Sequence, residues 1–591
     1  MMNVSRSVIS IGFAVSVASL YAANSGPVTA SGATPVFSKL VYPGKDGKLV
    51  YSPGEKGDVI PDFSNCGYMG GGVAIPDVPA RATIEPDPKA QDDTARIQAA
   101  IDKVSSMTCD AAGFRGAVLL TKGVYRVEGS LAIEQSGVVL RGEGDDEKGT
   151  VLVATGAKKR TLIAIKGPKA PEKASGARPQ IVDEYVPVGA RSFRVDSAAG
   201  LKPGDTIYVR RRGNKEWIHE IAMDRILPRM RKGRDGKESD STKQWKPFDL
   251  EFDRVIAALD GDRITVDAPI ACAIDKKWGG GEICKYADPG RIIQVGVENL
   301  RANSEFDKSV KAKYRDGKEY YSDENHGWTL VSIDQARNAW VRNVTAVHFG
   351  RSCVEVSKGA KWVTVQDCAC LDMVSVLTGG RRYPFVTSGQ LGLFQRCLAQ
   401  TARHAFAVES RVCGPNAFVD CMSLQNYGNS EPHHRWSVGG LYDNVNATIA
   451  MQDRQNMGSG HGWAGANYVA WNTEGSLVVQ QPPTAQNYAI GHVGKKDRGS
   501  FPRAGESWAK NHPGEPLPIN YSQKDGHWES LGKHVSPRSL YFQQLEDRLG
   551  KQAVLNVATQ DQLAGRLFEK ERAQSAAEAP PPIDESDDND E

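Results

Sequence analysis

The chain has 591 residues, 40% of them hydrophobic, and a formal net charge of +2. This length exceeds one ordinary domain unless the chain is a repeat solenoid, and the nearly balanced charge gives no general reason to expect a nucleic-acid partner. The 60 glycines are far below the share found in collagen-like or low-complexity chains. We therefore expect a folded protein whose functional electrostatics are local.

The N-terminal residues have the order of a secretory signal peptide. Arg6 supplies a positive charge, a short apolar stretch runs from Val8 to Tyr21, and small residues follow at positions 22–23. The stretch is too short to cross a bilayer comfortably, and no later segment is long and apolar enough to do so. We predict a signal peptide at 1–23, no membrane span, and a secreted or periplasmic protein after cleavage; a buried N-terminal helix is the alternative.

Ten cysteines are too few for a disulfide scaffold in a chain of this length. Cys368, Cys397 and Cys421 lie in apolar segments, where a thiol behaves as a small hydrophobic group. The cysteine spacing matches no zinc ribbon, so no metal ligand is predicted. One or two bridges stay open, for instance between Cys66 and Cys109.

Residues 92 to 144 begin with a helix signal and continue as short strands. Asp92 and Asp93 precede apolar residues at helical spacing from Ala95 to Ile101. Short β-rich runs, separated by Gly and Ser, follow at 117–120, 123–127, 131–133 and 137–142. Such strands cannot bury their own faces, so this pattern predicts the capped end of a solenoid.

Three motifs in this stretch, "DDTARIQAAID", "GAVLLTKGVYRV" and "GVVLRGEG", resemble the N-terminal cap and first coils of the pectate-lyase superfamily. The resemblance implies an all-β fold, a right-handed parallel β-helix of the pectin-lyase kind with an N-terminal capping helix. It implies no single reaction, because that superfamily contains lyases, hydrolases, epimerases and phage tailspikes. Further on, "PHHRW", "GSGHGWAGAN" and "QPPTAQNYAIG" look like features of a bacterial pectate-lyase-like group of unknown substrate.

From Trp340 onward, short apolar strands recur, and polar residues follow them at regular intervals. The equivalent polar positions are Asn343, Asp367, Arg396, Asp420, Asp443 and Asn472. Their intervals of 23 to 29 residues correspond to one β-helix coil each. Parallel stacking of the coils predicts a ladder of these side chains at one turn.

Two strand–turn–strand patterns interrupt the coils and predict a small inserted β-domain, with turns at 202–205 and 260–262. Its middle part, from Arg210 to Lys246, is rich in Lys and Arg. This middle part is either a solvated excursion or a flap that contacts substrate.

After about residue 500 the coil pattern fades. Residues 536–550 predict an amphipathic helix with Ser536 as its N-cap and Gly550 past its end, which would cover the open end of the solenoid. The predicted organisation is a signal peptide (1–23), an N-terminal extension (24–80), first coils with the capping helix (81–182), the inserted β-domain (183–290), main coils carrying the active site (291–495), a C-terminal extension with a helix (496–570) and an acidic disordered tail (571–591).

Four loop clusters between the repeating strands hold the residues that we expect to meet a substrate. Loops one coil apart are neighbours in a solenoid, so the clusters should converge on one surface. The substrate-binding candidates are Arg381, Arg382, Tyr383, His404, Arg411, His433, Arg454, Trp463 and Asn467. Arginine forks suit carboxylates and aromatic rings suit sugar faces, so the predicted partner is an anionic polysaccharide or oligosaccharide.

The same clusters favour β-elimination, in which the proton at C5 of a uronate is removed and the O4 leaving group departs. That reaction needs a group that neutralises the carboxylate, a base and an acid. The catalytic candidates are His434 or His461 as base, Arg403 and Arg435 as carboxylate binders, and Tyr442 as acid. They predict a secreted or periplasmic polysaccharide lyase that cleaves a uronic-acid-containing polysaccharide.

Two other functions stay open. A glycoside hydrolase on the same scaffold would need carboxylates, and of the three motifs in the polygalacturonase-like branch only Gly-His-Gly is present, at 460–462. A non-catalytic carbohydrate-binding or adhesive β-helix would need aromatic and amide groups more than histidines. No cofactor is assigned, although calcium stays open because some pectate lyases hold it with a cluster of acidic residues.

Overall fold

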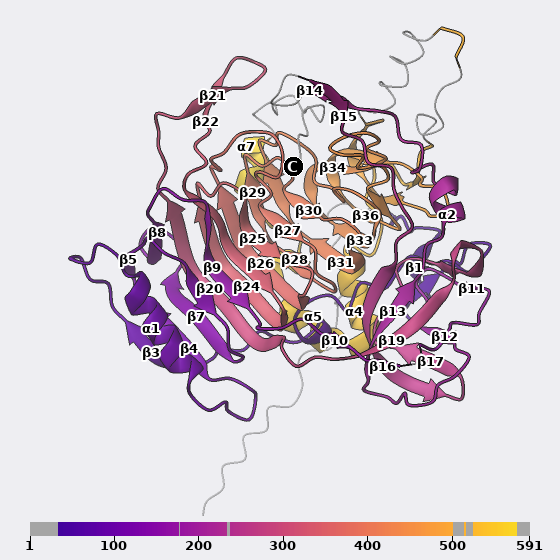
Figure 1. Ribbon diagram of the computed structural model, residues 1–591, viewed down its shortest axis with the longest axis horizontal. Helices are drawn as coiled ribbons and strands as arrows, with labels where there is room; N and C mark the ends of the chain where they lie inside the picture. Colours follow the sequence, from indigo (N-terminus) through magenta and orange to yellow (C-terminus); the bar gives the residue numbers. More distant parts are fainter. Residues whose placement is uncertain (1–33, 177, 233–236, 500–512, 516–523, 576–591) are drawn as a thin grey trace, which may run out of the picture. The chain divides into compact units, whose positions relative to one another are not determined.

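The computed structural model describes residues 34–176, 178–232, 237–499, 513–515 and 524–575 (Figure 1). The predicted signal peptide and residues 576–591 of the predicted acidic tail lie outside these ranges. The chain divides after Pro35, and the coils, the insert and the C-terminal helices all belong to the unit that begins at Val36. Within the described ranges, no helix is both long enough and apolar enough to cross a membrane.

The main body is a right-handed parallel β-helix, as predicted, in which successive coils stack strands into three parallel sheets (Figure 1). The first sheet contains β3 (Ala80–Ile84), β4 (Gly116–Leu120), β7 (Val138–Gly144), the first parts of β20 (Ile292–Ser304), β24 (Ala336–Val347) and β26 (Lys361–Leu371), then β28 (Leu393–Gln395), β31 (Cys413–Val419), β33 (Ser437–Asp443), β35 (Gly465–Ala466), β36 (Val469–Trp471), β38 (Tyr488–Ile490) and β40 (His527–Glu529). The second sheet contains β5 (Gly123–Val127), β8 (Thr150–Ala154), the second parts of β20, β24 and β26, then β29 (Leu398–Gln400), β32 (Met422–Leu424), β34 (Asn446–Met451), β37 (Glu474–Val479) and β39 (Val493–Lys496). The third sheet contains β6 (Leu131–Ile133), β9 (Arg160–Lys166), β23 (Gly327–Asp334), β25 (Ser352–Val356), β27 (Phe385–Thr387) and β30 (Phe406–Val408).

Stacked aliphatic side chains fill the interior of the coils. One such stack, each member no more than 1% exposed, consists of Val118, Leu140, Val297, Val341 and Val365. Burying an aliphatic side chain of this size contributes about 2 kcal/mol. The predicted capping helix is α1 (Thr94–Ser105), which adds Ile97, Ile101 and Val104 to this core.

In the later coils a residue in the left-handed region turns the chain from the first sheet into the second. This bend ladder consists of Asn299, Asn343, Asp367, Arg396, Asp420, Asn444 and Asn472, with φ values from +50° to +58°. Asn and Asp tolerate that conformation better than most residues. The predicted ladder position Asp443 is wrong by one residue, because Val419 pairs with Asp443 and Asp420 is therefore equivalent to Asn444. Residue type cannot separate an adjacent Asp and Asn; only strand register does.

The inserted domain is a β-domain with a main antiparallel sheet, and it leaves the coils after β9 and returns at β20. Its elements are β10 (Glu172–Lys173), β11 (Tyr185–Val186), β12 (Ser192–Arg194), β13 (Thr206–Arg211), α2 (Lys215–Glu220), β14 (Met230–Lys232), β15 (Glu238–Asp240), β16 (Leu250–Asp260), β17 (Arg263–Val266), β18 (Ile274–Asp275), the short helix η2 (Lys276–Trp278) and β19 (Gly281–Ala287). Because β10 pairs with β19, the insert begins before residue 183. The turn at 260–262 joins β16 to β17 as predicted, but β12 pairs with β17 and not with β13.

The middle of the insert is packed around its tryptophans and exposed along the strands β14 and β15. Trp217 is fully buried and Trp245 is 6% exposed. Both belong to one apolar cluster with Trp436 and Trp463 from the coils. The solvated interpretation therefore fails around these tryptophans, which pack against the coils, and holds for the exposed strands β14 and β15.

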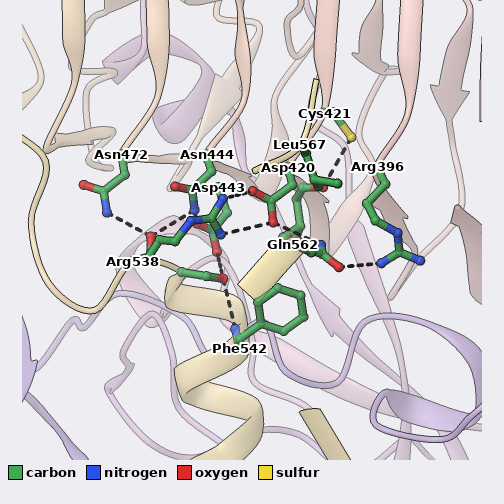
Figure 2. Close-up of polar contacts among 12 residues, drawn as sticks. Arg396, Asp420, Cys421, Asp443, Asn444, Asn472, Arg538, Phe542, Gln562 and Leu567 are labelled. Carbon is green, nitrogen blue, oxygen red and sulfur yellow. Dashed lines mark hydrogen bonds and ion pairs between the residues drawn. The ribbon is translucent and has the colours of Figure 1, made fainter. Parts of the chain in front are cut away.

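A C-terminal segment covers the bend ladder (Figure 2). Its helices are α4 (Leu540–Leu549), α5 (Lys551–Val557), α6 (Gln560–Leu563) and α7 (Glu569–Ser575). The predicted helix has Gly550 past its end as expected, but its N-cap is Ser539 and not Ser536, because the Ser539 hydroxyl accepts the hydrogen bond from Phe542 N. The carboxylate of Asp443 accepts hydrogen bonds from Ser539 Oγ at 2.7 Å and Tyr541 N at 2.9 Å.

Arg538 pairs with Asp420, and the amide of Asn472 donates to the carbonyl of Arg538 at 2.9 Å (Figure 2). Burial raises the pKa of Asp443 to about 7, although Ser539 and Tyr541 oppose the shift with hydrogen bonds. The C-terminal segment therefore binds the coils through polar groups at the bends.

The remaining described elements lie outside the coils. They are β1 (Val41–Pro43), β2 (Leu49–Tyr51), η1 (Tyr68–Gly70), β21 (Lys311–Lys313) and β22 (Glu319–Tyr321). The bridge between Cys66 and Cys109 is not formed, since Cys66 is buried beside α4 and Cys109 is exposed. The ten cysteines, all within the described ranges, are free thiols.

Candidate active site

Three loops that follow the second-sheet strands β29, β32 and β34 in successive coils bring the predicted histidines together. They span residues 401–405, 425–436 and 452–464. We call the set Tyr383, His404, His433, His434 and His461 the histidine cluster. Its rings contact one another in a continuous chain, with neighbouring centroids 4.7 to 5.2 Å apart. These five residues therefore converge, but not on a surface as predicted, because all of them except His434 are buried.

A buried carboxylate, Glu431, lies beneath the cluster. His433 Nδ1 is 2.9 Å from Glu431 Oε1 and His404 Nδ1 is 3.1 Å from the same oxygen. The fully buried guanidinium of Arg454 approaches that oxygen at 3.0 Å and compensates its charge. A charge buried in this way requires such a partner, because an uncompensated carboxylate would be strongly destabilising.

His433 links this carboxylate to a phenol. Its Nε2 lies 3.1 Å from the hydroxyl of Tyr383, while its Nδ1 faces Glu431. A chain of phenol, imidazole and carboxylate orients the imidazole and allows a proton to be shared along it. The buried layer of the site is thus a fixed hydrogen-bond network.

His404, Glu431 and His433 lie close enough together to share one metal ion. However, Arg454 Nη1 is 2.8 Å from His433 Nδ1, so a guanidinium already occupies the place where a cation would bind. Calcium prefers six to eight oxygen ligands, and two of these three donors are imidazoles. The donor set does not suit calcium, and Arg454 takes the place that any divalent cation would need.

His434 lies at the rim of the cluster, with 18% of its side chain exposed. Its Nδ1 is 3.6 Å from Glu409 Oε2, and Glu409 in turn lies 3.6 Å from Arg351. Burial lowers the pKa of Arg351, but the nearby carboxylates of Glu355 and Glu409 outweigh it and raise that pKa overall. His434 is therefore the most exposed histidine of the cluster, and a carboxylate lies near its Nδ1.

Arg411 and Arg435 come from successive coils and lie side by side at this rim. The backbone N–H of Arg411 donates to the carbonyl of Arg435 at 3.2 Å. Burial, and then the charge of Arg435, lower the pKa of Arg411. Within the described part of the chain no carboxylate pairs with Arg411, whose guanidinium lies 4.2 Å from the ring of Phe248. Two adjacent cations of this kind provide a place for an anion.

The structure places the other predicted residues in supporting positions. The Tyr442 hydroxyl donates to the carbonyl of Phe406 inside the coil core, where burial raises the pKa of Tyr442 well above its usual value. The prediction of Tyr442 as the acid is therefore wrong, since a fully buried core side chain cannot reach a sugar outside the coils. Trp463 packs in the core shared with the insert, and Asn467 donates to Ala271 O at 2.9 Å.

Among the predicted arginines, three bind neighbouring protein groups. Arg381 pairs with Glu324 at 2.8 Å. Arg382 is buried, burial lowers its pKa to about 10, and it donates to Ser375 O at 2.8 Å. Arg403 is 6% exposed and donates to the carbonyl of Gly379. Their guanidinium groups hold the loops around the cluster.

Sequence reasoning missed Glu431 and Arg351 as site residues and left Glu409 without a role. Glu431 begins the "EPHHRW" segment, so its place beside His433 could have been read from the sequence. Arg351 lies a coil before the four predicted clusters, and only the stacking of the coils brings it to Glu409. A long-range contact of this kind leaves no local signal.

No family model and no curated protein matches this chain. Among solved structures, it is similar to the tailspike protein gp49 from Pseudomonas phage LKA1, with 13% identity and a TM-score of 0.40 over 68% of this chain and 57% of that one. It is also similar to the polygalacturonase from Erwinia carotovora ssp. carotovora, with 11% identity and a TM-score of 0.32 over 72% of this chain and 95% of that one. The chain spans little more than half the length of the tailspikes it matches. Similarities this low do not transfer a function.

Proposed function

We propose that this protein is a secreted or periplasmic enzyme that cleaves a uronic-acid-containing polysaccharide by β-elimination. The observation that supports it is the rim of the histidine cluster, where the partly exposed His434, with Glu409 near its Nδ1, is followed in the chain by Arg435, whose charge acts on Arg411. A base next to a site for a carboxylate is the combination that removal of a proton beside a carboxylate requires.

In the proposed reaction, Arg411 and Arg435 bind the carboxylate of the uronate. Their charges stabilise the negative charge that develops as the proton leaves C5. Glu409 lies on the Nδ1 side of His434, so Nε2 is the nitrogen that would take the C5 proton. The C4–O4 bond breaks, a C4–C5 double bond forms, and the proton held on His434 passes to the departing O4 when both groups lie on one face of the sugar.

The network beneath supports this chemistry without contacting the sugar. Ring contacts of His433 and His461 with His434 hold its imidazole from below, and the buried Glu431–Arg454 pair holds His433. Rigid support of this kind keeps a reacting group within the narrow range of productive positions.

The test is an incubation of the protein with polygalacturonate, alginate, ulvan, glucuronan and glycosaminoglycans. We expect one of these polymers to yield reducing ends and the ultraviolet absorbance of an unsaturated uronate in equal amounts. New reducing ends without that absorbance would replace the proposal by a hydrolase. Retention of a polymer without any cleavage would replace it by a carbohydrate-binding or adhesive β-helix.

A further inference from the structure

The insert covers the loop that carries His461. Residues 452–464 form this loop, and Met223, Arg231, Lys243 and Trp245 of the insert contact it. The two parts are more than two hundred residues apart in the sequence.

Three consecutive carbonyls of the loop accept hydrogen bonds from the insert. The Arg231 guanidinium donates to Gly458 O at 2.9 Å, and the backbone N–H of Lys243 donates to Ser459 O at 2.9 Å. The indole N–H of Trp245 donates to Gly460 O at 2.9 Å. A loop of otherwise irregular conformation is thus held from outside, at one carbonyl after another.

The loop is also shaped to fit between the insert and the cluster. Gly462 has a φ of +58°, and a Cβ there would lie 2.2 Å from Met223 Sδ and 2.8 Å from the Trp245 ring. Gly458 has a φ of +54°, and a Cβ there would lie 2.1 Å from the His461 ring. Glycine at these two positions lets the loop adopt left-handed turns and approach rings on both sides.

The clamped loop directly contacts the proposed reacting groups. The guanidinium of Arg435 donates to Ser459 Oγ at 2.6 Å, and the backbone N–H of Arg435 donates to His461 O at 3.1 Å. The ring of His461 lies 4.9 Å from that of His434. A shift of the loop would therefore move the proposed carboxylate binder and the proposed base together.

We infer that the inserted domain positions the active site: Arg231, Lys243 and Trp245 clamp the loop 458–460, and the loop sets the positions of Arg435 and His434. The catalytic consequence of this inference rests on the proposed function. The clamp itself rests only on the hydrogen bonds between the insert and the loop. The three insert residues are positioning residues, because none of them contacts the histidine cluster in the observed hydrogen bonds.

The test compares Trp245→Phe with Trp278→Phe in the full chain. Trp245→Phe keeps an aromatic ring and removes the N–H that binds Gly460. Trp278 belongs to the same apolar cluster, but its ring contacts Lys277, so it is the matched control. We expect hydrogen exchange at the amides of Gly460 and Gly462 to become about tenfold faster in Trp245→Phe and to stay unchanged in Trp278→Phe.

The catalytic consequence is measured on the polymer that the enzyme cleaves. In Trp245→Phe we expect kcat/KM to fall about threefold to tenfold, as loss of one hydrogen bond predicts, with a shifted pH profile; Trp278→Phe should retain the wild-type profile. Faster exchange with unchanged kinetics, or unchanged exchange, would overturn the inference. If the wild type cleaves no polymer, the proposed function has failed, and the pH dependence of His434 carbethoxylation becomes the readout. A shift of this pH dependence in Trp245→Phe and not in Trp278→Phe supports the clamp. An unchanged pH dependence in Trp245→Phe refutes it.

Discussion

The bend ladder and the histidine cluster both arise because polar residues of successive coils stack on one another, yet the ladder is covered by another segment and the rim of the cluster is not fully covered. At the ladder, the C-terminal segment covers the side chains, and Arg538 pairs with Asp420 (Figure 2). Within the ladder, Arg396 pairs with Asp367. At the cluster, the buried Glu431 is also matched, by Arg454, but the rim ends in the adjacent cations Arg411 and Arg435.

The difference teaches that stacking alone does not make a site. A β-helix brings like residues together at every turn, and a covering segment with opposite charges turns such a row into a structural contact. Where the rim stays partly exposed, as at His434 and Arg411, the row can bind a ligand. Variants in the two regions should therefore separate activity from stability.

The largest expected effect concerns His434→Gln. Loss of the proposed base should lower kcat by about 10²- to 10⁴-fold, the range of general acid–base catalysis. The thermal midpoint should change by no more than about 2 °C, because the side chain lies at the rim. Assays of unsaturated product and thermal unfolding check both; retention of more than about a tenth of wild-type kcat would remove His434 from the mechanism.

The second prediction concerns the pH dependence of stability at the ladder. The folded pKa of Asp443, about 7, is raised above its unfolded value, so its contribution is complete in acid and is lost as the pH rises through about 7. Asp443→Asn has no proton to lose. The free energy of unfolding of the variant relative to the wild type should rise by about 4 kcal/mol between pH 4 and 8.

Denaturant unfolding at several pH values measures this difference. Activity near pH 7 should be the same in both proteins, because the ladder lies outside the proposed site. A constant difference across the pH range would show that Asp443 does not titrate as described.

Third, Arg538→Met should destabilise the fold and leave catalysis intact. It leaves the buried carboxylate of Asp420 without its ion pair, which should lower the free energy of unfolding by about 2 kcal/mol. Arg566→Met is the control, because Arg566 pairs with Asp561 on the surface and should change stability by about 0.5 kcal/mol or less. Equal effects of the two variants would contradict the role of Arg538.

The smallest expected effect is that of Arg411→Gln on substrate binding. Loss of one of two proposed carboxylate contacts should raise KM about tenfold, which corresponds to about 1.4 kcal/mol, and should also lower kcat, because the same charge is proposed to stabilise the developing negative charge. Arg126→Gln, which breaks an exposed pair with Glu305 in the first coils, should leave KM unchanged. An unchanged KM in Arg411→Gln would place the carboxylate elsewhere.

Much of the fold could be predicted because it depends on local, repeated signals. The α1 helix follows from apolar spacing behind Asp93, and the coils follow from strands that recur with polar residues at the bends. The exact bend residue could not be predicted, since Asp443 and Asn444 are adjacent and chemically alike. The start of α4 was misplaced by three residues for a related reason, because Ser536 and Ser539 are both capable N-caps.

The site was predictable in part. His433, His434 and His461 could be grouped because each lies in a loop of a recurring coil. The sequence did not show which of the candidate side chains are buried. Tyr442 and Trp463 are of the residue types that bind sugars, yet both are core side chains. Arg351 was missed because its contact to Glu409 spans two coils.

By itself, the sequence determined that the chain is a capped parallel β-helix with an insert, and that histidines and arginines gather in its later loops. These properties follow from periodicity, which local residue patterns carry. Only the tertiary structure decided which of the gathered groups are buried, which reach the rim, and that the insert holds the His461 loop through Trp245. Those outcomes depend on contacts between segments far apart in the chain, where burial and charge pairing are set by packing and not by local sequence.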